Sequence, residues 1–164
     1  MNPIGDLGPC AVIFNGVDLG ATKGGVKFKH TEASTPVVED QSGISAIDEI
    51  KVGYTCEIEV PLTRSSLGQL SSVIGNSTYT GAALRVGVAV GISLLDNAKQ
   101  LILKPIVNNV VSTDVKEWLT IHKAYPKVDL EVVYDSEGQR VYKCIFKAFP
   151  DTTRDASDRL WRIG

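Results

Sequence analysis

Hydrophobic and polar residues alternate along most of the chain with a period of two, which is the pattern of half-buried β-strands. The clearest case is residues 54–60, where Tyr54, Cys56, Ile58 and Val60 alternate with polar side chains. Similar or wholly apolar runs predict further strands at residues 10–14, 25–32, 84–92, 101–106, 118–122, 127–132 and 142–148. About eight strands separated by turns predict a mainly β fold, an antiparallel β-sandwich or barrel.

Turn-forming residues separate these runs. Asn15-Gly16 follows the first strand, and this pair predicts a two-residue hairpin because both positions of a type I′ turn need positive φ. Asp96-Asn97 and residues 135–138 predict turns between later strands. The runs at 84–92 and 101–106 are apolar on both faces, so we expect a helix or a neighbouring subunit to cover them.

One segment has a helical period. After Pro61, residues 65–74 place Leu67, Leu70 and Val73/Ile74 on one face. Thr63, Ser65 or Ser66 is available as the N-cap, and Gly75 as the stop. This predicts one short α-helix. Residues 155–162 carry a weaker helical pattern, and residues 150–164 as a whole are interpreted as a C-terminal tail.

Residues 36–53, with the sequence PVVEDQSGISAIDEIKVG, form a long inter-strand loop between the predicted strands 25–32 and 54–60. Hairpins usually close within a few residues, and a longer connection that keeps many aliphatic side chains needs a surface to bury them. Two interpretations remain open: an extra strand folded back on the parent sheet, or a contact with another subunit. The candidate contact residues are Val37, Val38, Asp40, Gln41, Ile44 and Ile47.

Composition narrows the classes of function. The chain has 164 residues, the size of a single domain covering 1–164, with 43% hydrophobic and 22% charged residues. A net charge of −2 provides no basic field for binding nucleic acid through its phosphates. The first residues lack the pattern of a signal peptide, and no apolar run has the length of a membrane span. We expect a soluble protein made in a cytoplasm.

The sequence contains no constellation typical of an enzyme. Cys10, Cys56 and Cys144 are far apart and lie in apolar runs, so we interpret them as core residues and expect no metal site. His30 and His122 end strand patterns, and no GxSxG motif accompanies them. Residues 20–25 resemble a phosphate loop only in glycine content, and we interpret them as a turn before a strand. We expect no catalytic residue and no cofactor.

Four segments follow one another in a recognisable order: FNGVDLGATKGGVKF, PVVEDQSGISAIDEIKVG, YTCEIEVPL and SSLGQLSSVIG. This order resembles the major tail tube proteins of long-tailed bacteriophages, which share their fold with the tube protein of type VI secretion systems. The resemblance covers the first half of the chain. The second half is strand-rich but has no distinctive motif.

The resemblance implies a structural virion protein whose hexameric rings stack into a hollow tail tube, the conduit for genome ejection. Residues 36–53 would reach the adjacent ring, and Glu57 and Glu59 would line the lumen, where negative charge repels DNA. Lys27 and Lys29 would oppose that effect if their strand faced the lumen.

The implied partners are other copies of the chain, tape-measure, baseplate and tail-terminator proteins, and a sheath protein in a contractile tail. DNA would pass without specific binding, and no membrane is involved. The implied location is the phage tail, after assembly in the host cytoplasm. The alternatives are another β-rich tail or baseplate protein (distal tail, hub or terminator), a small ligand-binding β-barrel, and an enzyme.

Overall fold

The computed structural model of the protein describes residues 8–130, 136–138 and 140–164. Strands account for 52% of the structure and helices for 11%, with one α-helix, and the sheets are antiparallel. The predictions of a mainly β, antiparallel fold with one short helix are confirmed. The prediction of a barrel is wrong, because the large sheet is not closed.

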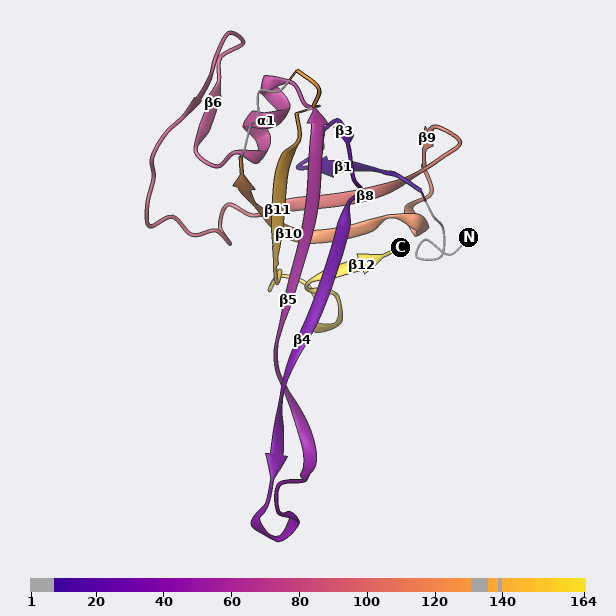
Figure 1. Cartoon of the computed structure of the whole chain (residues 1–164), viewed down its shortest axis with the longest axis vertical. Coiled ribbons are helices and arrows are strands. Elements are labelled where there is room, and N and C mark those ends of the chain that lie inside the picture. Colours follow the sequence, from indigo (N-terminus) through magenta and orange to yellow (C-terminus); the bar gives the residue numbers. More distant parts are fainter. Residues whose placement is uncertain (1–7, 131–135, 139) are drawn as a thin grey trace.

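Ten strands form one continuous sheet, in the order β2-β1-β8-β10-β11-β5-β3, with β12 on β10, β4 on β5 and β9 on β8. Two further strands, β6 and β7, form a separate hairpin (Figure 1). The strand bounds are β1 Cys10–Phe14, β2 Val17–Asp18, β3 Ala21–Thr22, β4 Lys27–Val38, β5 Ala46–Arg64, β6 Ser77–Tyr79, β7 Leu84–Val86, β8 Lys99–Val107, β9 Val110–Val111, β10 Leu119–Asp129, β11 Tyr142–Phe149 and β12 Trp161–Ile163.

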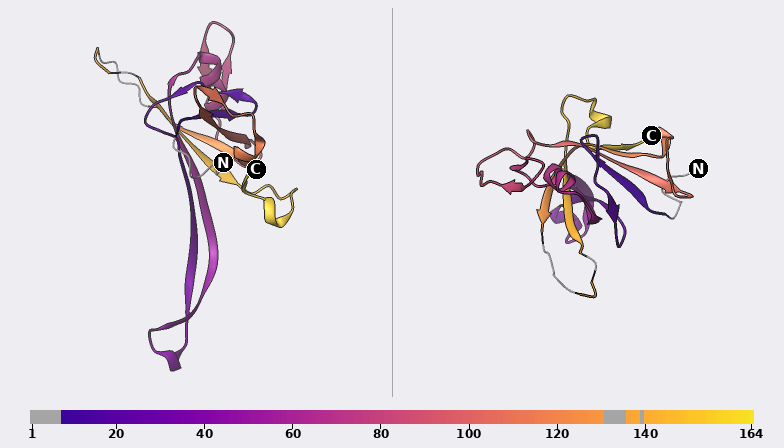
Figure 2. Two further views of the ribbon diagram at one scale, coloured as in Figure 1. Left: turned by 90° about the vertical axis from the view of Figure 1, so that its right-hand side faces the viewer. Right: turned by 90° about the horizontal axis from the view of Figure 1, so that it is seen from above.

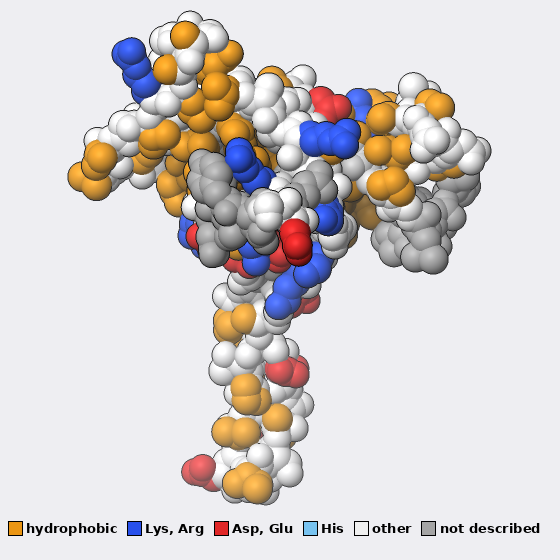
Figure 3. All heavy atoms as spheres, turned by 45° about the horizontal axis from the view of Figure 1, so that its top comes forward, with side chains coloured by type: hydrophobic (Ala, Val, Ile, Leu, Met, Phe, Trp, Pro, Cys, Tyr) orange, Lys and Arg blue, Asp and Glu red, His pale blue; other side chains and the backbone are white. Residues whose placement is uncertain are grey.

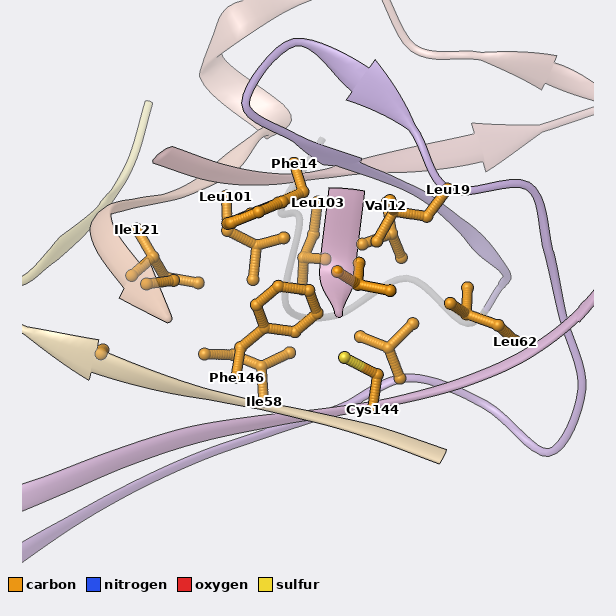
Figure 4. Packing of buried hydrophobic residues seen from close by; sticks show 14 of the residues in the cluster. Val12, Phe14, Leu19, Ile58, Leu62, Leu101, Leu103, Ile121, Cys144 and Phe146 are labelled. Carbon is orange, nitrogen blue, oxygen red and sulfur yellow. The ribbon is translucent and has the colours of Figure 1, made fainter. Parts of the chain in front are cut away.

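The large sheet curls around a single hydrophobic core (Figure 4). Phe14 on β1 packs against Phe146 on β11, with ring centroids 5.1 Å apart, although β8 and β10 lie between these strands in the sheet. Such a contact across the core requires the sheet to bend back on itself. The fully buried side chains come mainly from β1, β5, β8, β10 and β11, with Leu19 between β2 and β3, and include Val12, Ile58, Val60, Leu62, Leu101, Ile121, Cys144 and Phe146.

The helix α1, Leu67–Val73, is held by the capping that its sequence predicts. Ser66 is the N-cap, its side chain accepts from the Gln69 backbone N–H, and the Gln69 side chain accepts from the Ser66 N–H. Leu70 and Val73 are buried, whereas Leu67 stays 46% exposed. The helix is therefore confirmed, with a narrower apolar face than predicted.

The first predicted turn is also confirmed. Asn15 and Gly16 have φ of 50° and 79°, and Phe14 pairs directly with Val17. Both central residues adopt the positive φ that a type I′ hairpin needs.

Three sequence predictions need correction. Residues 84–92 were predicted to be one strand, but only β7 is regular, and Val88 and Val90 beyond it are 95% and 90% exposed. Hydrophobicity alone cannot supply the hydrogen-bonded partner that a strand requires. The strand predicted at 127–132 ends at Asp129 in β10, and residues 131–132 and 135 of the predicted strand and turn lie outside the described residues.

The third correction concerns the C-terminal segment, which is neither a tail nor an α-helix. It forms a 3₁₀ turn, η3 (Ala156–Asp158), and then β12, which pairs with β10. His122 on β10 is buried, and its Nε2 lies 2.8 Å from the Asp158 carboxylate, which also accepts a hydrogen bond from Arg154 at 3.0 Å. These bonds hold η3 and β12 against the sheet.

The pKa of Asp158 provides a test of this attachment. The hydrogen bond from His122, followed by the charges of His122 and two arginines, lowers the pKa of Asp158 below its ordinary value despite some desolvation. A lowered carboxyl pKa contributes stability above the ordinary Asp range, which is lost as the pH falls through the lowered value.

We therefore expect Asp158→Asn to lower the thermal unfolding midpoint at pH 7, with the difference from the wild type shrinking as the pH falls below about 4. Asp155→Asn, at an exposed position whose side chain makes no capping bond, is the matched control. Calorimetry of the three proteins across pH measures the effect. An unchanged midpoint for Asp158→Asn at pH 7 would mean that the segment is held by packing alone.

Candidate assembly interface

The arm, defined as residues 31–55, is a two-stranded antiparallel ribbon that projects from the body along the long axis (Figures 1 and 2). β4 and β5 begin to pair within the body, with Lys27 opposite Glu59, and continue to Val38 opposite Ala46. β11 pairs with the other edge of β5 only as far as Glu57. Beyond that point the described residues place no third strand beside the ribbon.

The arm corrects the prediction of a long loop over residues 36–53. Most of that segment is paired strand, and the connection comprises only residues 39–45. It contains the 3₁₀ turn η1 (Asp40–Ser42) and then Gly43, whose φ of 63° is rare for residues with a side chain. Of the two open interpretations, a strand folded back on the parent sheet is wrong, because the extra strand extends the hairpin outward, and the contact with another subunit stays a prediction.

The sequence did not predict this ribbon because the pairing of its two strands is irregular at two places. The register shifts between Ala33 and Ser34, and again between Val37 and Val38, with an extra residue in β5 each time. An inserted residue breaks the alternation of faces and increases the local twist. The period of two is thus lost in the sequence although the backbone ladder continues.

The arm buries almost none of its aliphatic side chains. Ile44 at the tip is 101% exposed, and no residue from 31 to 55 is buried. The other large exposed side chains are Val38 at 55%, Ile47 at 51%, Ile50 at 55%, Val52 at 63% and Tyr54 at 42%. A two-stranded ribbon is marginal by itself in water, so these residues favour a partner that covers them.

The structure brings most of the predicted contact residues together at the arm tip. Val38, Ile44 and Ile47 are exposed there, and Asp40 and Gln41 lie in η1 between them. Val37 is only half-buried and sits opposite Asp48. The predicted contact set left out Ile50, Val52 and Tyr54, which are exposed on β5 nearer the body. Their apolar character is visible in the sequence, but the sequence did not predict the ribbon that carries them.

The arm is acidic. Lys51 forms an ion pair with Glu32, and His30 lies 3.7 Å from the same carboxylate. Among the described residues, no further cationic side chain lies within ion-pair distance of an arm carboxylate. The carboxylates without a cationic partner are Glu39, Asp40, Asp48 and Glu49. A partner that covers the aliphatic side chains would therefore meet a rim of negative charge.

The candidate lumen residues Glu57 and Glu59 lie on the sheet face opposite the core, among lysines. Directly opposed residues share a face, so the lysines of this face include Lys27 opposite Glu59, Lys29 and Lys147 opposite Glu57, and Lys143, whose Nζ lies 3.4 Å from Glu59. A hollow of about 220 Å³ lies between Lys29, Thr31, Thr55 and Glu57. This face has charges of both signs, so the negative field expected of the two glutamates is offset. Its position in a lumen stays a prediction.

The two histidines contact aromatic and acidic side chains, and His30 lies opposite the buried Cys56. His30 is stacked beside Tyr54 and edge-on to Trp161, and His122 is hydrogen-bonded to Asp158. In the described part of the chain, no three His, Cys, Asp or Glu side chains are grouped to hold a metal ion. The helix found there is too short and too polar to cross a membrane.

The chain was compared with known proteins on two levels. No protein-family model matches it, and no curated protein matches it either.

The three free cysteines allow one prediction about reactivity. Burial raises the pKa of Cys10 to about 11, of Cys56 to about 11 and of Cys144 to about 12. Because the thiolate is the reactive form, all three thiols are poor nucleophiles at neutral pH.

We expect alkylation by iodoacetamide at pH 7.5 to be at least about a hundredfold slower in the folded protein than in denaturant, since the thiolate fraction falls tenfold per pKa unit. Mass spectrometry of timed samples measures each site, and half-exposed Cys10 should be the fastest of the three. A folded protein that reacts at the denatured rate would show that a thiol is accessible and activated.

Proposed function

We propose that the protein is a structural subunit that assembles with copies of itself into stacked hexameric rings, and that the rings form the tail tube of a long-tailed bacteriophage. The observation that carries the proposal is the arm, an acidic, aliphatic ribbon that projects from a compact body without covering any of its own core. The order of the sequence segments that resembles tail tube proteins adds the expected context of a phage virion.

The energetics of the arm favour a second subunit as its cover. Fully burying one Val or Ile side chain contributes about 1.5–3 kcal/mol relative to leaving it exposed. Val38, Ile44, Ile47 and Ile50 each expose more than half of their surface. Covering these side chains therefore contributes a free energy of the same order as the ordering and the loss of free rotation that binding costs.

The shape of the molecule favours a head-to-tail contact. The arm leaves one end of the long axis, and the β6–β7 hairpin lies at the other end (Figure 1). A contact between two different surfaces of the same chain either closes into a ring or repeats without limit. A tube of stacked rings needs one contact that closes each ring and another that repeats from ring to ring. The open edge of β4 is also a liability in a lone subunit that assembly would remove.

The channel of such a tube would carry double-stranded DNA without holding it. A face with alternating Glu and Lys, like the one around Glu57 and Glu59, offers no continuous row of cations to the phosphates. This face is our candidate for the lumen.

Two other functions are less favoured. A ligand-binding barrel would need a closed sheet, and the large sheet is open. A hollow of about 240 Å³ beside Phe14, Ile92 and Tyr125 is also smaller than most small-molecule sites. A distal tail, hub or terminator protein would be equally β-rich. Repeated stacking of identical copies is expected of a tube protein only, so the formation of tubes would distinguish it from these proteins.

The first test is replacement of Val38, Ile44 and Ile47 together by Ser. Because these side chains are exposed in the subunit, the thermal midpoint should stay within about 3 °C of the wild type. Electron microscopy should show tubes for the wild type and none for the variant. Val17, Val110 and Val115, also exposed, give the matched Ser control, which should still form tubes. Unfolding of the arm variant would place these residues in the core, and normal tubes would exclude the arm as the contact.

The second test is reversal of Glu57 and Glu59 to Lys. Tubes should still form, but they should retain double-stranded DNA in low salt and release it as salt rises, because lysines bind phosphates. Co-sedimentation of preformed tubes with DNA measures retention. Asp96→Lys with Asp155→Lys makes the same change of charge elsewhere on the exposed surface. Equal retention by the two variants would remove Glu57 and Glu59 from the lumen.

A further inference from the structure

A second exposed apolar segment lies in the body of the molecule, far from the arm tip (Figure 1). The valine segment, defined as residues 87–92, has the sequence GVAVGI. Val88 and Val90 are 95% and 90% exposed, and Ile92 is 44% exposed. It follows β7 directly, where Val86 is 59% exposed. Aliphatic side chains this exposed are unusual in a folded body and mark an interaction site.

The backbone of the valine segment is as open as its side chains. The Gly87 N–H donates to the Asn76 carbonyl at 2.9 Å, and the chain is next tied down by the turn at residues 93–98, where the Asn97 side chain donates to the Ser93 carbonyl at 2.8 Å. Between these points, residues 88–92 make no hydrogen bond to any described residue. Residues 88–90 thus have unpaired backbone donors and acceptors, which is a condition for pairing with an added strand, and the stretch ends at Gly91, whose φ of 78° is not extended.

The region around the valine segment is also nearly free of charge. From residue 65 to residue 95 the only charged side chain is Arg85, which is exposed on β7. Figure 3 shows hydrophobic side chains gathered over this end of the molecule and again along the arm. An apolar surface with a single positive charge suits a partner that is aliphatic and acidic.

We propose that the valine segment is the receptor for the arm of a second copy of this chain, whose β5 edge adds to residues 88–90 as a strand. This inference rests on the proposed self-assembly and names the two surfaces that meet. We assign the contact to β5 because this strand carries the exposed side chains of Ile47, Ile50, Val52 and Tyr54. The edge of β5 that pairs with β11 inside the body has no partner strand between Glu57 and the arm tip among the described residues.

The two surfaces complement each other in three ways. Both present exposed β-branched side chains, which pack well between neighbouring strands. Both have unpaired backbone groups that a shared ladder would satisfy. The four arm carboxylates that lack a cation would face Arg85, the one charge of the receptor region. Since the surfaces differ, the contact is head-to-tail and repeats from copy to copy.

The test uses the full chain with Val88 and Val90 replaced by Ser. Both side chains are exposed in the subunit, so its unfolding midpoint should not change, and the critical concentration for tube assembly should rise at least about tenfold. Val110→Ser with Val115→Ser is the matched control and should assemble like the wild type. Normal assembly of the Val88/Val90 variant would overturn the proposal.

Cross-linking identifies the contact directly. A chain carrying both Ile50→Cys and Val90→Cys, treated with a short bis-maleimide, should give a ladder of covalent multimers, whereas the single variants should stay monomeric and their mixture should stop at dimers. Dimers from Val90→Cys alone would mean that the valine segment meets its own copy, and no ladder in assembled tubes would mean that the arm docks elsewhere.

These outcomes separate the two proposals. Wild-type tubes that the Val38/Ile44/Ile47 variant abolishes, together with unaffected tubes from the Val88/Val90 variant, would refute the receptor and leave the tube proposal standing. A wild type that forms no tubes, together with a cross-linked ladder from the chain carrying Ile50→Cys and Val90→Cys, would refute the tube and support the contact between arm and valine segment.

Discussion

The ladder of hydrogen bonds between β4 and β5 is the constraint on which the rest of the structure depends. Inside the body, β5 contributes Cys56, Ile58, Val60 and Leu62 to the core, and this packing holds one end of the ribbon rigidly. The same two strands then leave the body with their pairing intact. A ribbon without a core of its own is stable only because the buried half fixes its direction and register.

This arrangement separates folding from assembly in energetic terms. The core gains its stability from side chains that the sheet curls around, among them Phe14 and Phe146. The arm and the valine segment contribute almost nothing to that core. Substitutions in either should therefore act on contacts between copies and leave the subunit folded, which is the property expected of surfaces reserved for other chains.

The arm and the valine segment differ in charge, and this difference favours contact between them over contact between two like surfaces. Exposed strand edges and aliphatic side chains usually lead to uncontrolled aggregation. Here the tip of the arm and the adjacent part of β5 carry Glu39, Asp40, Asp48 and Glu49, whose charges repel a second arm. The valine segment lacks such protection but is short, with β7 before it and the turn at residues 93–98 after it. Charge on one surface and its near absence on the other favour unlike contacts over like ones, which is a condition for ordered stacking.

The local elements of this protein were determined by the sequence alone. The turn at Asn15-Gly16 and the helix capped by Ser66 were predictable because each depends on neighbouring residues and their own backbone preferences. The strands that supply the core were predictable from their alternation. The apolar character of residues 36–53 was also evident, and the structure shows most of these aliphatic side chains exposed.

Only the tertiary structure decided the shape of that surface. The arm depends on pairing between residues that are distant in the sequence, and its two register shifts erase the period by which a strand is recognised. The C-terminal strand depends on the place left beside β10 and on the bond between His122 and Asp158. Residues 88–92 have a strand-like sequence but no strand to pair with. A strand exists only where a partner supplies the other half of each hydrogen bond, and no single segment of sequence contains that information.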